Sequence, residues 1–74
     1  MNTAKQNDIR GRYRHYKGNE YEVIGMSVHT ETAEKTVVYR ALVDPDKIWN
    51  RPYDMFFESV KIDGKIIARF ERID

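Results

Sequence analysis

The side chains that can do chemistry in this chain are few and far apart. Its two histidines, His15 and His29, fit none of the short spacings that place two imidazoles on one metal ion. The serine and threonine hydroxyls lie outside the glycine pattern that exposes a catalytic nucleophile. The chain has no cysteine, which excludes thiol chemistry and cysteine-bound zinc. These observations indicate no metal, no cofactor and no catalytic residue, and they favour a protein that is not an enzyme.

His29 and Glu31 are the strongest candidates for catalysis. A carboxylate two residues away can orient an imidazole ring, as it does at many catalytic sites. The simpler interpretation is that both residues cap the end of a strand in a polar loop, because no further ligand accompanies them. A small enzyme that uses His29, Glu31 and a nearby arginine stays an alternative.

A basic stretch offers a different kind of site. Arg10, Arg12 and Arg14 recur with a period of two, so they share one side of a strand, and Tyr16 follows in the same phase. Arginine and tyrosine on a sheet surface suit single-stranded nucleic acid, through phosphate contacts and base stacking. The net charge of only +1 argues against such a ligand. We therefore favour a solvated strand face with salt bridges, and nucleic-acid binding stays an alternative.

Trp49 and Arg51 also share one face of a strand, because they are two residues apart. An indole beside a guanidinium can bind a ligand or form a simple cation–π contact. The other interpretation is that this tryptophan fills the core.

The elements that must position these residues are mostly strands. Isoleucine and valine far outnumber leucine and alanine among the 74 residues, and such branched side chains favour pleated sheets. The length allows one domain, for which we expect a flexible N-terminal tail at 1–9 and a single β domain at 10–74. No apolar run is long enough for a membrane helix, and Met1–Arg10 lacks the apolar centre of a signal peptide. We expect a cytoplasmic protein with no membrane partner.

Turn signals divide the chain into short strands. Gly18-Asn19 is a two-residue hairpin type, and counting outward from it places His15 opposite Glu22. Asp63-Gly64 predicts a second tight hairpin, and Asp44-Pro45-Asp46-Lys47 predicts a type I turn. Pro52 favours one short helical turn. The strands expected between these signals are Arg12–Lys17, Glu20–His29, Thr36–Leu42, Ile48–Arg51, Val60–Ile62 and Lys65–Phe70.

The expected register defines two faces of the sheet. Pairing Val28 with Val37 predicts one apolar core face, made of Tyr13, Ile24, Met26, Val28, Val37, Tyr39 and Ala41. On the opposite face, Arg12, Gly25 and Arg40 form one row, in which the glycine leaves a shallow gap. Two guanidinium groups over exposed glycine backbone suit a carboxylate or a phosphate. Tyr16 and His29 lie on the same face and can supply a ring and a further donor.

Several motifs occur together, in one order, along nearly the whole chain. They are Gly11-x-Tyr13-x-His15-Tyr16-Lys17-Gly18, His29-x-Glu31-Thr32, Val38-Tyr39-Arg40-Ala41-Leu42, Trp49-x-Arg51-Pro52, Met55-Phe56, Gly64 and Arg69-Phe70. The set resembles domain-of-unknown-function family 1653, with mild departures at Thr30 and Val43. The resemblance implies a small, mostly bacterial, single-domain protein with an SH3-like β-roll. It implies no activity and no catalytic residues, because the family has none established.

The sequence therefore predicts a mostly β protein: an SH3-like barrel or roll of five or six antiparallel strands, with at most one short helical turn. We expect a non-catalytic binding module that recognises an anionic group, either on a small molecule or on a partner protein. The residues expected to bind it are Arg12, Tyr16, His29, Arg40, Trp49 and Arg51.

Overall fold

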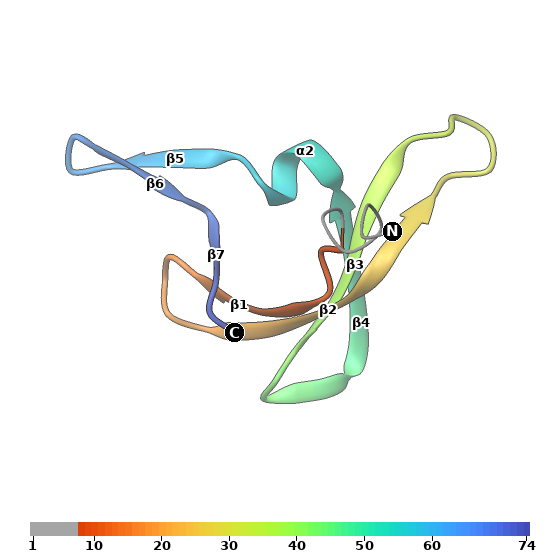
Figure 1. Ribbon diagram of the computed structural model, residues 1–74, viewed down its shortest axis with the longest axis horizontal. Coiled ribbons are helices and arrows are strands. Elements are labelled where there is room, and N and C mark those ends of the chain that lie inside the picture. The colour runs from red at the N-terminus through yellow and green to blue at the C-terminus, as the bar shows by residue number, and fades with distance from the viewer. Residues whose placement is uncertain (1–7) are drawn as a thin grey trace.

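The computed structural model describes residues 8–74 (Figure 1). Its elements, in chain order, are β1 (Gly11–His15), β2 (Glu20–Val28), β3 (Lys35–Ala41), β4 (Asp44–Pro52), α2 (Tyr53–Phe56), β5 (Ser59–Ile62), β6 (Lys65–Ala68) and β7 (Phe70–Arg72). Over the same residues, no helix has the length and apolar character needed to cross a membrane.

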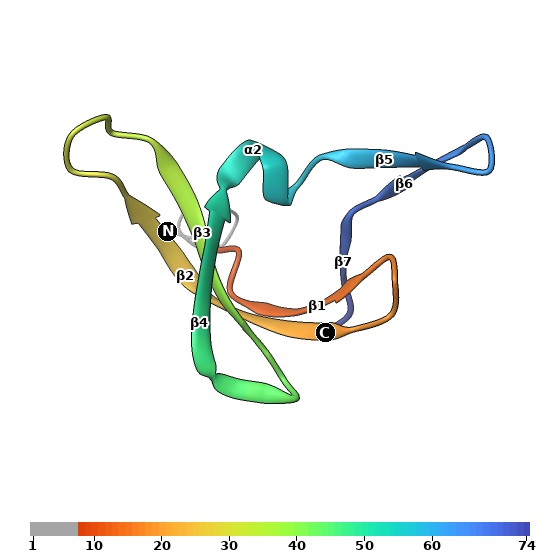
Figure 2. The same cartoon turned by 180° about the vertical axis from the view of Figure 1, so that it is seen from behind.

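Five strands form one antiparallel sheet in the order β4-β3-β2-β1-β7, while β5 and β6 form a separate hairpin. The sheet is strongly curved, and α2 lies over its concave side, from which the β5–β6 hairpin extends (Figures 1 and 2). The predicted mostly β class with one short helical turn is confirmed. The strands of residues 8–74 number seven rather than five or six, and this part of the chain does not close into a barrel.

The helical turn α2 begins directly after Pro52. The ring of proline holds its φ at −50°, which suits the start of a helix, and the Phe57 amide closes the turn by donating to the Tyr53 carbonyl at 3.2 Å. This turn points Phe56 into the core, where the side chain is fully buried.

The core is built mainly from aromatic rings. Phe56 and Phe70 stack in parallel with their centroids 4.1 Å apart, and Tyr13 and Tyr39 meet Phe56 at 5.5 and 5.3 Å in edge-to-face geometry. The buried residues are Tyr13, Val23, Val37, Tyr39, Phe56 and Phe70. A chain of this length buries few residues, so each ring contributes a large share of the stability.

The first hairpin differs from its prediction. The connection between β1 and β2 is a four-residue loop, in which the His15 amide donates to the Asn19 carbonyl at 2.8 Å and the Gly18 amide to the His15 carbonyl at 2.7 Å. Gly18 adopts φ +112°, a conformation that glycine takes without strain. The loop is also tied by the Lys17 amide, which donates to His15 Nδ1. The two-residue Gly18-Asn19 turn was therefore wrong.

The longer loop moves the register of the first two strands by three residues. Tyr13 lies opposite Tyr21 and Arg12 lies opposite Glu22, so the predicted pairing of His15 with Glu22 was wrong. Because side chains alternate between faces, a shift by an odd number exchanges the two faces of one strand. Val23 is consequently buried, where Ile24 was expected.

A bulge in β2 changes a second time which side chains of this strand face the core. The register of β2 with β3 shifts between Val23 and Gly25, so that Val23 pairs with Tyr39 but Met26 pairs with Val37. Tyr13, Val37 and Tyr39 are core residues as predicted. The prediction was wrong for Ile24, Met26 and Val28, which are 40%, 49% and 56% exposed.

Of the other two predicted turns, one is confirmed and one was wrong. Asp63-Gly64 joins β5 to β6 with positive φ at both residues, as a two-residue hairpin requires, so this prediction is confirmed. The chain turns at Leu42 and Val43, not at Asp44–Lys47, because Ala41 pairs directly with Asp44. The residues that follow Asp44, Pro45 among them, lie in a register shift of β4, where proline needs no ladder hydrogen bond.

The predicted tail at 1–9 falls mostly outside the described residues. Of its last two positions, Asp8 forms an ion pair with Arg10 at 2.9 Å, and Ile9 packs against the core. The Tyr13 hydroxyl donates to the Ile9 carbonyl at 2.9 Å, which anchors this segment to β1.

Replacement of Phe56 by alanine should lower the free energy of unfolding by about 3–5 kcal/mol, because it leaves a cavity under Phe70. Phe57 provides a matched control: it is adjacent and chemically identical but 36% exposed, so Phe57→Ala should cost about half as much or less. Urea denaturation of both variants measures the difference. Equal losses would contradict the assignment of Phe56 to the centre of the core.

Candidate functional site

The predicted row of Arg12, Gly25 and Arg40 is different in the structure. Arg12 and Arg40 do share a row on the outer face, but Glu22 stands between them and Gly25 lies opposite Val38. Both Nε and Nη2 of Arg40 donate to the Glu22 carboxylate, at 3.0 and 2.9 Å. The predicted glycine gap between two arginines was therefore wrong. The guanidinium of Arg40, which was expected to bind an anionic ligand, is already paired with the Glu22 carboxylate.

The rest of the outer face is also neutralised. Arg14 pairs with Glu20 at 3.2 Å and lies opposite Glu71 on β7. Tyr16 does not belong to this face; it lies in the β1–β2 loop with its ring stacked on His15 at 4.5 Å. The outer face thus lacks the ring and most of the free positive charge that the sequence had suggested.

His29 lies at the other end of the sheet, in the exposed β2–β3 loop (Figures 1 and 2). Its Nδ1 accepts from the amides of Glu31 and Thr32 at 3.1 and 3.4 Å, while the Glu31 carboxylate lies 3.7 Å away. The imidazole thus accepts the loop amides with Nδ1, which is also the nitrogen that lies nearest the Glu31 carboxylate. The Thr30 hydroxyl donates to the Glu31 carboxylate at 2.7 Å, so this carboxylate also takes part in the hydrogen bonds that close the loop.

Trp49 and Arg51 lie on the concave side of β4. Trp49 sits opposite Tyr39 but is 48% exposed, so it does not fill the core. Arg51 is half-buried: its Nε donates to the Tyr39 hydroxyl in a long hydrogen bond of 3.5 Å, and its Cζ lies 5.8 Å from the centre of the Phe70 ring. Arg51 therefore contacts the aromatic core, whereas Trp49 shares its side of β4 but stays exposed, with Lys47 over its ring at 5.5 Å.

Phe70 contacts two basic groups with its ring and follows a third in the chain. His15 meets the ring edge-on at 4.9 Å, Arg51 lies over it, and Arg69 precedes it in the chain. We call these three residues, together with Lys17, the cation cluster. Arg69 forms an ion pair with Glu58 through Nη2.

Two features of the cation cluster stand out among residues 8–74. Arg51 is half-buried and pairs with no carboxylate there. The Nε of Arg69 is buried and has no hydrogen-bond partner in the same part of the chain. Buried guanidinium groups are normally paired, and buried polar atoms are normally bonded, so both features mark a place suited to an acceptor.

His15 is held neutral by its surroundings. Burial lowers its pKa below the usual 6.5, and the charges of Arg69, Lys17 and Arg51 lower the pKa further. Because the Lys17 amide donates to Nδ1 at 3.1 Å, the neutral ring carries its proton on Nε2. The cation cluster thus presents guanidinium groups and one imidazole N–H, all of them hydrogen-bond donors.

Donors of this kind can bind an anion through charge-assisted hydrogen bonds. Across residues 8–74 no three histidine or acidic side chains come close enough to hold a metal ion. Of the residues predicted to bind, Arg51 is in the cation cluster and Tyr16 adjoins it through His15. His15 and Arg69 were not among the predicted binding residues, although both stand in the quoted motifs, because the wrong register gave His15 a carboxylate partner.

A hollow of about 440 Å³ adjoins the cation cluster at the corner between the end of β1 and β6. His15 and Tyr16 line one side of it, and Ile67 and Ala68 line another. Arg14 and Glu71, which pair across β1 and β7, complete the lining. We call this space the corner hollow.

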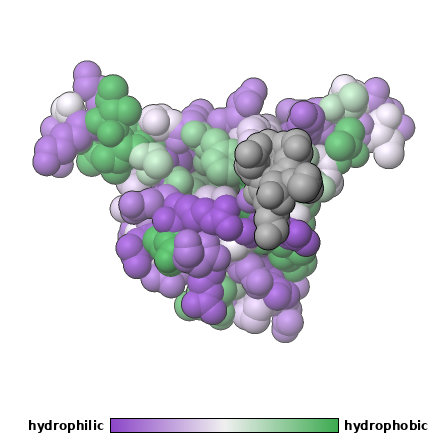
Figure 3. All heavy atoms as spheres, in the orientation of Figure 1, coloured by the Kyte–Doolittle hydropathy of each residue, from purple (hydrophilic) through white to green (hydrophobic). Residues whose placement is uncertain are grey.

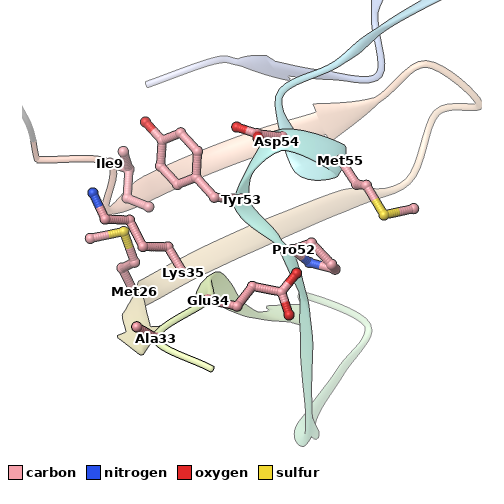
Figure 4. A pocket seen from close by; sticks show the side chains of 9 residues that line it. All are labelled: Ile9, Met26, Ala33, Glu34, Lys35, Pro52, Tyr53, Asp54 and Met55. Atoms are coloured by element: carbon pink, nitrogen blue, oxygen red, sulfur yellow. The ribbon is translucent and has the colours of Figure 1, made fainter. Parts of the chain in front are cut away.

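A larger hollow of about 1030 Å³ lies between the β2–β3 loop and α2 (Figure 4). Its walls include Met26, Tyr53 and Met55, while the charged ends of Glu34 and Lys35 point in different directions (Figure 4). A binding site for a small ligand normally has polar groups that converge. This hollow shows no such convergence.

Comparison with known proteins gives two matches and one negative result. Residues 11–72 match the family model described as "Protein of unknown function (DUF1653)". A crystal structure of a DUF1653 protein from Bordetella bronchiseptica is 32% identical, covers 92% of this chain and 90% of its own, and superposes with a TM-score of 0.80. No curated protein matches the chain. The match spans nearly the whole domain, including every element that builds the cation cluster, and on this basis the chain belongs to the DUF1653 family.

Proposed function

We propose that this protein is a non-catalytic binding module that recognises an anionic group at the cation cluster. The observation that carries the proposal is the half-buried Arg51, which has no carboxylate partner among residues 8–74. The unsatisfied Nε of Arg69 supports it.

The local charge balance favours an anion. Arg51, Arg69 and Lys17 all act on His15, and Glu58 is the carboxylate that pairs with one of them. A charge beside an aromatic core is less well screened than one in water, so unbalanced cations attract an anion more strongly there. Arg12 on the outer face is also free of an ion pair within the described residues, but it is fully hydrated and gains less from an anion.

The donors of the cation cluster fit an oxyanion. Arg51 holds Tyr39 with Nε only, which leaves its two Nη groups to bind a carboxylate or phosphate through paired hydrogen bonds. The Nε2–H of His15 adds a neutral donor nearby, as the Nδ1 contact of the ring directs it. A carboxylate on a partner protein offers the same chemistry as a small anion.

The two alternatives find less support. Arg10, Arg14 and Arg40 pair with carboxylates, so the outer face offers little positive charge to a nucleic-acid backbone. An enzyme based on His29 and Glu31 would need its imidazole free to accept a proton, and the loop amides already bond Nδ1.

Arg51→Gln should weaken the binding of inorganic phosphate by about 1.5–3 kcal/mol, the usual size of a hydrogen bond to a charged group. Trp49, the only tryptophan of the chain, lies two residues away on the same face of β4 and serves as a fluorescence reporter. Titration calorimetry gives the dissociation constant independently of any change in the fluorescence baseline.

Arg12→Gln is the matched control, because it removes the same charge from the outer face. It should leave phosphate binding unchanged. If the Arg12 variant loses binding and the Arg51 variant keeps it, the anion binds on the outer face and the proposal fails.

The stability of the protein should depend on His15 between neutral and mildly acidic pH. The pKa of His15 is lowered in the folded protein, so on acidification the unfolded chain takes up its proton first and the free energy of unfolding falls. The contribution is fully present above the ordinary histidine pKa and is lost as the pH falls through the lowered value. Urea denaturation at about pH 7.5 and about pH 5 should show a smaller loss for His15→Gln than for the wild type.

His29→Gln is the control for this measurement, since it removes the other histidine from an exposed loop. A smaller loss in His15→Gln than in His29→Gln assigns the pH dependence to His15. An unchanged loss in His15→Gln would show that burial and the neighbouring charges do not hold His15 neutral in the folded protein.

A further inference from the structure

We propose that the ligand is an oxyanion attached to a planar ring, and that the ring occupies the corner hollow while the oxyanion binds the cation cluster. The inference rests on the proposed function and adds the chemical class of the ligand. It is carried by the position of His15, which belongs to both the corner hollow and the cation cluster.

His15 joins the two sites over a short distance. Its ring lies 4.5 Å from the Tyr16 ring, in the wall of the corner hollow, and 4.9 Å from the Phe70 ring, at the centre of the cation cluster. The Tyr16 amide also donates to the Arg69 carbonyl at 3.0 Å, which ties the wall of the hollow to the segment that carries Arg69. A ligand with its ring joined directly to its charged group is small enough to contact both.

The walls of the corner hollow suit a flat apolar group. The rings of Tyr16 and His15 stack with 30° between their planes, and both residues line the hollow, so one wall of it is aromatic. Ile67 and Ala68 face this surface from β6. Aromatic rings and branched aliphatic side chains on two sides of a space favour a ring through stacking and dispersion.

The charged residues at the corner hollow do not select a charged group there. Arg14 and Glu71 lie opposite each other across β1 and β7, and Arg14 also pairs with Glu20. The half-buried Arg51, which pairs with no carboxylate among residues 8–74, belongs to the cation cluster, and the cluster meets the hollow at His15. The corner hollow therefore suits the uncharged part of the ligand, and the volume of about 440 Å³ lies in the range of small-molecule sites.

The β5–β6 hairpin borders the corner hollow and exposes apolar side chains to water. Ile62, Ile66 and Ile67 are exposed on it, and Figure 3 shows hydrophobic atoms gathered over the hairpin. A two-stranded hairpin has little stability of its own in water. A ring in the corner hollow covers part of Ile67 and thereby adds a contact between the hairpin and the β1–β2 loop.

Titration calorimetry with four probes tests the inference on the full chain. Phenyl phosphate should bind about tenfold more tightly than inorganic phosphate, which corresponds to one good aromatic contact. Butyl phosphate should fall clearly below phenyl phosphate, since it is apolar but has no ring to stack. Benzoate, compared with phenyl phosphate, shows whether the oxyanion is preferred as a carboxylate or as a phosphate.

Ala68→Ile fills the corner hollow and should remove the advantage of phenyl phosphate while inorganic phosphate binds as before. Ser59→Ile is the matched control: Ser59 is the cross-strand partner of Ala68 but does not line the hollow. Tyr16→Leu should reduce the advantage of phenyl phosphate over butyl phosphate in particular, because it removes the aromatic surface. Thermal denaturation of each variant confirms that it is folded.

The two proposals fail in different ways. If phosphate binding depends on Arg51 but phenyl phosphate gains nothing over phosphate, or if Ala68→Ile keeps the gain, the ring site is excluded and the proposed function stands. If no probe binds the wild-type protein, both proposals are overturned. If phenyl phosphate binds equally well to Arg51→Gln, the ring binds without the cation cluster and the joint site is excluded.

Discussion

The stacked contact between Phe56 and Phe70 joins the two parts of this small domain. Phe56 ends α2 and Phe70 begins β7, and the chain between them forms a hairpin that lies outside the main sheet. Glu58 directly precedes this hairpin and Arg69 directly follows it, and the two residues form an ion pair. The parallel rings therefore fix where the hairpin leaves the sheet and where it returns, and with it the positions of both charged residues.

The same ring makes the site dependent on the core. Phe70 buries one part of its surface against Phe56 and meets Arg51 and His15 with others. A guanidinium held over an aromatic ring is partly removed from water, which lowers its hydration but strengthens its attraction for an anion. The packing of the core and the placement of the donors are thus coupled through one side chain: what orders Phe70 also orders Arg51 and His15 around it.

The sequence predicted what depends on local chemistry and missed what depends on contacts across the fold. Asp63-Gly64 has a backbone preference strong enough to set its turn alone, and Pro52 sets the helical turn in the same way. The β1–β2 loop, by contrast, is closed partly by His15 Nδ1, and the bulge before Gly25 reflects the fit of β2 on β3. Neither the loop nor the bulge has a signature in the order of the residues. Because the predicted register was wrong, His15 was not recognised as part of the candidate site.

The distribution of charge over the fold could not be predicted from the sequence either. A net charge of +1 describes the chain as nearly neutral, yet the neutrality is uneven in space. Arg14 and Arg40 form ion pairs with carboxylates on neighbouring strands, so the positive charges on their side of the sheet are balanced locally by negative ones. Arg51 lies on the other side, among rings that offer a cation–π contact but no counter-charge. An unpaired charge costs little in water and much beside a core, so a half-buried position without a carboxylate partner among residues 8–74, not the number of arginines, sets Arg51 apart from the arginines of the outer face.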